Sequence, residues 1–213
     1  MKNYFSNKLS LAVFMILTLI STSTLYSQRV EFTPYLGYMF AGKMTLYEGD
    51  LNIRNNPNYG ITIDFEVDRK AGIFVELLYD RLDTRVDFIA YPTNVTTTIF
   101  DLSEEYYHVG GLYNSEINEK VSSFGVFTLG ATRLHPKDSN YGDDWKFSLT
   151  FGGGVKYFVS KTIGIRLQGR LKMPFLFSSG GVWVGPGGTY SYGGGSALLQ
   201  ADLTAGIIIR TGE

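Results

Sequence analysis

Few residues in this chain could carry nucleophilic or metal-assisted chemistry. The 213 residues include two histidines and no cysteine, which excludes disulfides, thiolate metal sites and cysteine nucleophiles. His135 precedes Asp138, Ser139 and Asp143, residue types that can form a hydrolase or acyltransferase site, but their spacing matches no motif with a defined mechanism. His108 lies in an alternating segment, where a structural role is expected. We therefore predict no catalytic residues, no metal site and no cofactor.

Small or polar side chains, several of them charged, occupy every second position of several apolar segments. In residues 59–67, for example, Ile61 and Ile63 alternate with Thr62 and Asp64. This period of two predicts strands with one apolar face and one polar face. The polar faces together carry six acidic and six basic side chains, which we predict to pair in one narrow interior: Glu31, Asp64, Glu66, Glu76, Asp80, Asp202, Lys146, Lys156, Arg166, Arg170, Lys172 and Arg210.

Eight segments of this kind must position these charges. They span residues 29–40, 58–67, 72–83, 105–114, 121–133, 145–158, 162–175 and 197–210. An even number of strands of roughly ten residues predicts an all-β fold, an eight-stranded antiparallel up-and-down transmembrane β-barrel. Connections alternate between short, at 68–71, 115–120 and 159–161, and long, at 41–57, 84–104, 134–144 and 176–196. Short turns are typical of the periplasmic side and long loops of the outer surface.

The orientation of the two strand faces separates a membrane barrel from a soluble one. A secreted, lipocalin-like barrel would turn its apolar face inward around an apolar ligand, whereas a membrane barrel turns that face toward lipid. Aromatic residues near the strand ends favour the membrane barrel, because such girdles mark the two interfaces. The expected girdles contain Tyr38, Phe40, Tyr59, Tyr79, Trp145 and Phe175 on the outer side, and Phe32, Phe65, Tyr113 and Tyr157 on the inner side.

The N-terminus has the order of a secretory signal peptide. Lys2 and Lys8 precede the apolar run 11–20 and the polar stretch 21–27, and this apolar run is too short for a membrane helix. We expect residues 1–27 to be cleaved, which leaves residues 28–213 as one barrel domain. The whole chain has a net charge of −1, which argues against nucleic-acid binding, because that binding needs an excess of Lys and Arg.

Three strand motifs and the last segment carry a resemblance to a known family. They are Thr33-Pro-Tyr-Leu-Gly-Tyr38, Phe127-Thr-Leu-Gly-Ala-Thr132, Phe151-Gly-Gly-Gly-Val-Lys-Tyr157 and Asp202-Leu-Thr-Ala-Gly-Ile-Ile-Ile-Arg210. In this order they resemble the small outer-membrane β-barrel proteins of Gram-negative bacteria, the OmpA/OmpX-type porin-family domain, in versions from a Bacteroidetes-like lineage. The resemblance implies location in the cell outer membrane, without a shared catalytic site. The expected partners are outer-membrane lipid, lipopolysaccharide and the barrel-assembly machinery.

The last long loop indicates where a binding function would lie. The glycine-rich residues 180–195 carry Trp183, Tyr190 and Tyr192, whose aromatic side chains can contact a glycan, a lipid headgroup or a protein. We predict a monomer whose wall anchors four long surface loops, and whose function is structural or an interaction with an extracellular ligand rather than catalysis. Two alternatives remain: a narrow passive pore for small solutes or ions, and the secreted soluble barrel with an apolar ligand.

Overall fold

The computed structural model describes residues 29–45, 49–91, 93, 95–138, 142–176, 182–185, 188–191 and 196–212. The expected signal peptide, residues 1–27, lies outside the described residues. No helix within these ranges is long and apolar enough to cross a membrane. The described chain is built from antiparallel strands, as the alternating sequence predicts.

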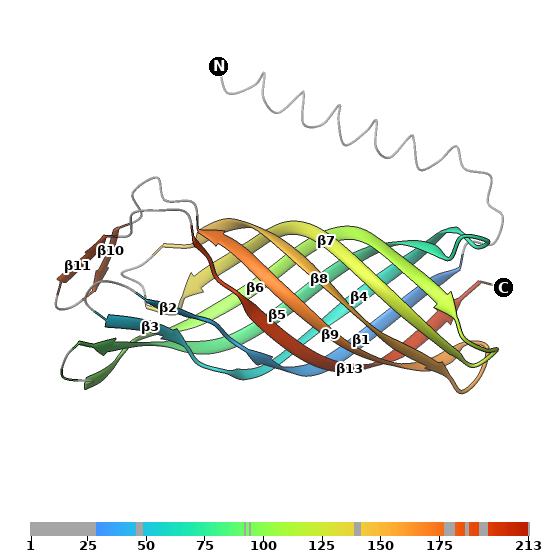
Figure 1. Cartoon of the computed structure of the whole chain (residues 1–213), viewed down its shortest axis with the longest axis horizontal. Helices are drawn as coiled ribbons and strands as arrows, with labels where there is room; N and C mark the ends of the chain where they lie inside the picture. The colour runs from blue at the N-terminus through green and yellow to red at the C-terminus, as the bar shows by residue number, and fades with distance from the viewer. Residues whose placement is uncertain are drawn as a thin grey trace, which may run out of the picture.

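Eight long strands of the described chain close into a ring (Figure 1). Each pairs antiparallel with its neighbours, and the first strand closes the ring against the last, with Val30 opposite Thr211. The eight-stranded antiparallel barrel is therefore confirmed. In ring order the strands are β1 (Val30–Phe40), β4 (Asn56–Asp68), β5 (Ile73–Ala90), β6 (Val95–Glu116), β7 (Val121–Pro136), β8 (Asp144–Phe158), β9 (Ile163–Leu176) and β13 (Gln200–Thr211).

The three short connections lie at the same end of the barrel as the C-terminus (Figure 1). In the first of them, Asp68 Oδ1 accepts hydrogen bonds from the amides of Lys70 and Ala71, at 2.9 and 3.0 Å. Gly72 follows with φ of 68°, a conformation that favours glycine because it has no Cβ. Short turns mark the periplasmic end of an outer-membrane barrel, so the opposite end faces outward.

Residues 84–104 form a strand hairpin, so the sequence prediction of a long loop there is wrong. β5 continues to Ala90 and β6 begins at Val95. A register shift between Val86 and Asp87 interrupts the period of two, which explains why the alternation could not be followed through this segment. A buried apolar cluster holds the extension together: Val86, Phe100, Leu102 and Leu134, with Ile53 and Ile99 packed against it.

Shorter strands enlarge the sheet at the outer end. β3 (Gly49–Ile53) pairs with the extension of β5, and β2 (Lys43–Thr45) pairs with β3. β10 (Val182–Gly185) and β11 (Gly188–Ser191) form a separate hairpin, and β12 (Ser196–Ala197) pairs with β9. The sheet therefore extends outward beyond the closed ring on the side of β5 and β6.

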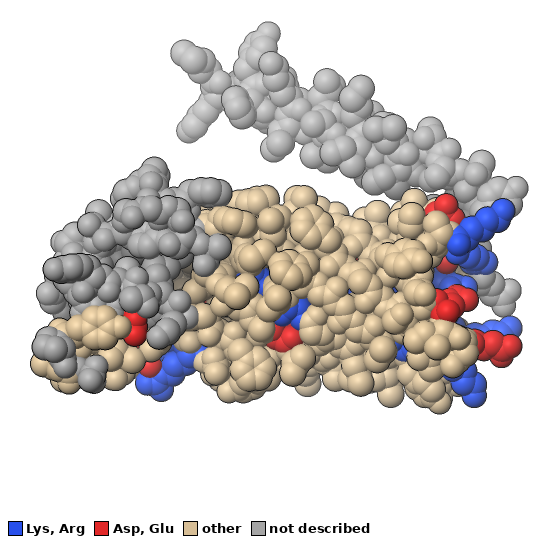
Figure 2. All heavy atoms as spheres, viewed as in Figure 1, with Lys and Arg blue, Asp and Glu red and all other residues tan. Residues whose placement is uncertain are grey.

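The apolar face of the strands lies on the outside of the barrel. Leu36 is 71% exposed and Leu203 is 61% exposed, and the visible face is mostly uncharged between charged ends (Figure 2). Tyr107 connects two girdle residues, with ring centroids 5.2 Å from Tyr79 and 5.8 Å from Trp145. An outward apolar band with aromatic residues is the surface of a membrane barrel. The alternative of a soluble barrel with an inward apolar face is wrong, because the charged face points inward.

Candidate functional site

The interior of the barrel holds most of the charges that the sequence pattern selects. Arg166 and Lys156 are among the largest fully buried side chains of the described protein. Arg210 is partly buried at the periplasmic end and Lys146 is partly exposed. The buried members of the set are Glu31, Asp64, Glu66, Glu76, Asp80, Lys156, Arg166, Arg170, Lys172 and Asp202.

A chain of ion pairs begins at the periplasmic end. Arg210 Nη2 lies 2.7 Å from one carboxylate oxygen of Glu31, and Lys156 Nζ lies 2.7 Å from the other. Lys156 also lies 3.4 Å from Asp64 Oδ2, which is 2.7 Å from Arg166 Nη1. Each buried cation in this chain therefore has a carboxylate partner, which buried charges require.

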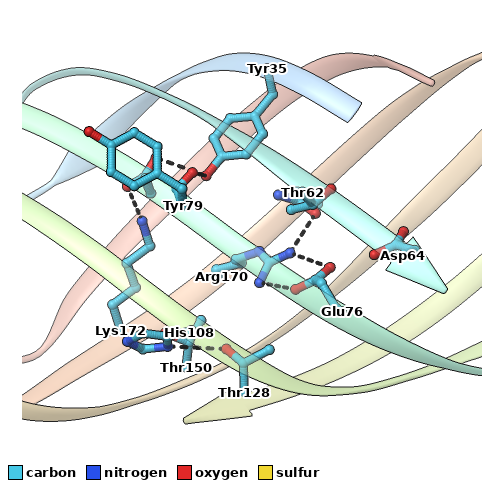
Figure 3. Close-up of polar contacts among 12 residues, drawn as sticks. Tyr35, Thr62, Asp64, Glu76, Tyr79, His108, Thr128, Thr150, Arg170 and Lys172 are labelled. Carbon is cyan, nitrogen blue, oxygen red and sulfur yellow. Dashed lines mark hydrogen bonds and ion pairs between the residues drawn. The ribbon is translucent and has the colours of Figure 1, made fainter. Parts of the chain in front are cut away.

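Arg166 and Arg170 then share the carboxylate of Glu76. Arg166 Nη2 donates to Glu76 Oε2 at 2.7 Å, and Arg170 Nη2 donates to the same oxygen at 2.9 Å. Figure 3 shows Arg170 directed toward Glu76 within the barrel. Because β5 and β9 lie on opposite sides of the ring, with three strands between them on either side, these bonds cross the lumen.

A second group of pairs lies nearer the outer end. Lys172 pairs with Asp80 and with Asp202, the latter at 2.8 Å. The hydroxyl of Tyr35 donates to Asp80 at 2.9 Å, and Asn58 Nδ2 donates to Asp80 at 3.0 Å and to Asp202 at 3.2 Å. Lys172 on β9 and Asp80 on β5 again face each other across the ring.

The sequence prediction of site residues does not include Glu104, Tyr106 and Gln200, which are also buried in the interior. Gln200 Nε2 donates to Glu104 Oε2 at 2.9 Å, and the Tyr106 hydroxyl is hydrogen bonded to Gln200. The ammonium of Lys172 lies 4.6 Å from the Tyr106 ring centroid, in cation–π geometry. Glu104 follows the same alternation as Tyr106 and His108, but the segment predicted from the sequence begins only at residue 105.

Apolar side chains also pack inside the barrel, at two levels. Near the periplasmic end, Phe124 packs with Phe74, Leu112 and Val126, and the guanidinium carbon of Arg166 lies 4.3 Å from the Phe124 ring centroid. Toward the outer end, buried Met39 and Leu82 pack with Tyr106. The lumen is therefore a packed interior of mixed character and is more apolar than the charge pattern alone predicts.

With this geometry in place, comparison with known proteins decides the family. The model of the outer membrane protein beta-barrel domain matches residues 12–171, which is more than half of the chain. The chain belongs to this outer-membrane β-barrel family. Together with its outward apolar band, membership places the protein in the outer membrane of a Gram-negative cell. No curated protein matches the sequence.

Solved structures of outer-membrane barrels share the fold. OprG from Pseudomonas aeruginosa has a TM-score of 0.58 and 9% sequence identity, and the match covers 88% of this chain and 97% of that chain. The neisserial surface protein A has a TM-score of 0.53 and 13% identity, and the match covers 85% of this chain and 96% of that chain. At these identities the likeness concerns the barrel architecture.

Lys146 and Glu66, which the sequence pattern predicts to be interior charges, lie at the rims of this outer-membrane β-barrel. Lys146 Nζ lies 2.7 Å from Asp144 Oδ2 at the outer end of β8, with 21% of its side chain exposed. Lys146 shares the face of buried Ser148 and Thr150 but lies at the mouth of the barrel, because β8 begins only two residues earlier. Glu66 lies at the periplasmic rim, 3.1 Å from Arg69 Nε.

For the aromatic residues predicted in the last long loop of the outer-membrane barrel, the structure gives backbone positions. Trp183 on β10 is directly opposite Tyr190 on β11. Tyr192 lies outside the described residues. The structure therefore brings the first two positions together in one hairpin, and their role in binding stays a prediction.

The two histidines of the barrel protein lie far apart. In the interior, His108 Nε2 lies 2.6 Å from Ser148 Oγ, and its Nδ1 lies 3.2 Å from Thr128 Oγ1 and 3.1 Å from Thr150 Oγ1; Figure 3 shows this hydroxyl-lined wall. His135 is hydrogen bonded to Asp143 at the outer end. No group of three or more His, Asp or Glu side chains within the described ranges is arranged to hold a metal ion.

A charged network lies on the outside of the wall just beyond the girdle. Glu105 accepts hydrogen bonds from Arg81 Nη1 at 3.1 Å, from Arg133 Nη1 at 3.0 Å and from the Tyr107 hydroxyl at 3.0 Å. Arg133 Nη2 continues to Asp143 at 2.6 Å. Hydrogen bonds from His135 and then Arg133 hold the pKa of Asp143 below its usual value. This network joins three strands above the membrane band.

Proposed function

We propose that the protein is a monomeric, plugged barrel that anchors a surface-exposed sheet and loops for interaction, rather than an open channel or an enzyme. The observation that carries the proposal is a set of bonds between opposite strands at successive heights. Lys156 and Asp64 join β8 to β4, Arg166 and Glu76 join β9 to β5, and Tyr106 and Gln200 join β6 to β13.

Charge and packing both support a closed lumen. Removing one partner of a buried ion pair leaves an uncompensated charge, which costs several kcal/mol, so the cross-lumen pairs resist separation. The apolar cluster of Phe74, Leu112, Phe124 and Val126 occupies the periplasmic half. An ion moving along this axis would have to displace both kinds of contact.

In this proposal, a partner binds at the outer end of the barrel. Outer-membrane lipid and lipopolysaccharide would surround the wall, and the barrel-assembly machinery would insert it. Trp183, Tyr190 and Tyr192 remain the proposed contacts to an extracellular ligand, because aromatic side chains supply large contact area with few rotatable bonds.

The histidine environments support a role without catalysis. The ring of His108 contacts hydroxyl groups in a buried wall, so substrate would have to enter the packed lumen to reach it. At the outer end, His135 is hydrogen bonded to Asp143, and Ser139, the serine of the sequence hypothesis, lies outside the described residues.

A narrow pore is the second candidate, and one observation favours it. Thr33 Oγ1 and Thr204 Oγ1 are buried without a hydrogen-bond partner from the protein. Water molecules would satisfy these groups, and water inside the barrel is the first requirement for passage of small solutes or ions.

Single-channel recording in planar lipid bilayers separates the two candidates. The full-length mature protein is expected to give no lasting conductance above that of protein-free bilayers. Glu76→Ala is expected to produce openings, because it removes the carboxylate shared by Arg166 and Arg170. A stable open channel in the unmodified protein would contradict the plug and support the pore.

A further inference from the structure

The outer end of β6 forms a free edge of the sheet. β7 pairs with β6 only from Pro136, opposite Leu102, in the part of the chain that the structure describes. One further backbone hydrogen bond follows, from Lys137 N to Asp101 O at 2.8 Å, and no described residue pairs with the other side of residues 95–99. Residues 95–98 pair with β5 on one side, and Ile99 is the extra residue at the register shift between Val86 and Asp87. Backbone donors and acceptors on the other side of this segment are therefore directed away from the sheet.

The sequence of this edge strongly favours strand pairing. Val95-Thr-Thr-Thr-Ile99 consists of five β-branched residues without a charge, and such residues favour extended structure. Val95 is 58% exposed and Thr96 to Thr98 are exposed. The edge has neither the lysine nor the proline that commonly protects exposed strands. By contrast, the opposite edge of this sheet is β2, a strand of three residues that includes Lys43.

We propose that the Val95–Ile99 edge pairs antiparallel with the same edge of a second copy of this protein. A two-fold axis through Thr97 places Thr97 opposite Thr97 and Thr96 opposite Thr98, and Val95 then faces the bulged residue Ile99. Threonine pairs across antiparallel strands are favourable, and the uncharged segment creates no repulsion between identical copies. The edge is thus self-complementary, as an isologous contact requires.

The geometry assigns the second copy to a facing membrane. An antiparallel ladder that continues the sheet has its two-fold axis perpendicular to that sheet. Because the sheet is part of the barrel wall, this axis also reverses the direction of the barrel axis, so the outer ends of the two barrels point toward each other. Figure 1 shows the β5–β6 hairpin in green at the end opposite the C-terminus. Thr97 is ten residues beyond Tyr107 of the girdle, a reach of up to ~33 Å at ~3.3 Å per residue.

The small contact explains why this pairing is compatible with a monomer in detergent. Five residues from each copy bury far less than the ~1,200 Å² of a stable interface. Many such contacts between two membranes act together, however, because the first contact raises the effective concentration for the next. The edge is therefore expected to hold membranes together without forming an isolated dimer.

Vesicle clustering tests the proposal. The full-length mature protein is reconstituted in phosphatidylcholine vesicles, and clustering is followed by light scattering beside protein-free vesicles. Thr97→Lys and Thr97→Glu each place like charges opposite each other at the two-fold axis, so each variant alone is expected to cluster at least roughly tenfold more slowly. Mixing the two populations pairs opposite charges and is expected to restore clustering.

Two controls keep the result specific to the edge. Gly142→Lys adds the same charge at the outer end, where a side chain meets no atom within 4 Å, and is expected to cluster like the unmodified protein. Heat-dependent migration on a gel confirms that each variant is folded. Unmodified vesicles that stay dispersed would overturn the proposal, as would Thr97→Lys vesicles that cluster normally. Dispersed vesicles that instead bind an added extended peptide would assign the edge to a peptide partner and also overturn pairing between copies.

Discussion

Arg166 on β9 reaches across the barrel to Glu76 on β5, with 2.7 Å between Nη2 and Oε2. Three strands separate β5 from β9 on either side of the ring, so this bond spans the lumen. The same guanidinium donates to Asp64 Oδ2 at 2.7 Å. One arginine therefore ties its own strand to two strands of the opposite wall, and the stability of the barrel is expected to depend on it.

Glu76→Ala is expected to destabilise the barrel by about 3–5 kcal/mol, because it leaves two buried guanidinium groups without their shared carboxylate. Urea unfolding of the protein in lipid vesicles, followed by tryptophan fluorescence, measures the change. Arg85→Ala is the control, since it removes an exposed pair with Asp101 at 2.9 Å and should cost less than ~1 kcal/mol. Equal stabilities for the two variants would show that the cross-lumen pairs contribute little.

Ile63→Arg and Leu167→Arg are each expected to cost about 2–4 kcal/mol and to impair assembly, because both side chains lie on the outward face within the apolar band. The fraction of protein with heat-dependent migration after folding into vesicles measures assembly. Val159→Arg adds the same charge in an exposed periplasmic turn and should assemble normally. If both band variants assembled like Val159→Arg, the outward face would not be in contact with lipid.

Gly72→Ala is expected to destabilise the periplasmic turn by about 1 kcal/mol or more. Its φ of 68° disfavours a side chain, and a Cβ there would lie 2.2 Å from the carbonyl oxygen of Asn114. Gly111→Ala is the matched control, because its Cβ would meet no atom within 4 Å. Amide hydrogen exchange at residues 70–73 reports the turn locally, and equal exchange in the two variants would contradict this reading of Gly72.

The outer rim is expected to loosen as pH falls below about 4. Asp143 has a lowered pKa in the folded protein because His135 and Arg133 donate hydrogen bonds to it. A group with a lowered pKa contributes stability above its unfolded value of ~3.9, and that contribution is lost as pH falls through the folded value. The protection factors of the amides of residues 133–135 and 137, which compare the measured exchange rate with the intrinsic rate at the same pH, should therefore fall in acid.

Asp143→Asn provides the comparison for the pH experiment. This variant should show lower protection factors at the same amides already at neutral pH, with a smaller further fall in acid. The interior pairs serve as an internal reference, since Asp143 does not contact them. An acid-induced fall in the protection factors of equal size in the variant and the unmodified protein would assign the pH dependence to another group.

The local pattern of the chain determined much of the barrel. A period of two needs only neighbouring residues, so the sequence predicted that Asp64, Glu76 and Arg166 lie on polar strand faces and that eight strands close a barrel. It also predicted the outward position of Leu167. The same approach failed at residues 84–104, because a register shift at Val86 and Asp87 breaks the period that the prediction depends on.

Only the tertiary structure decided which charges meet. Arg166 and Glu76 are 90 positions apart, and their contact depends on ring closure between β1 and β13, which sets the register of all eight strands together. The same closure leaves Lys146 at the rim and brings Tyr106 to Gln200 inside. Alternation assigns a side chain to a face, but only the closed register assigns its height along the lumen, and ion pairing depends on that height.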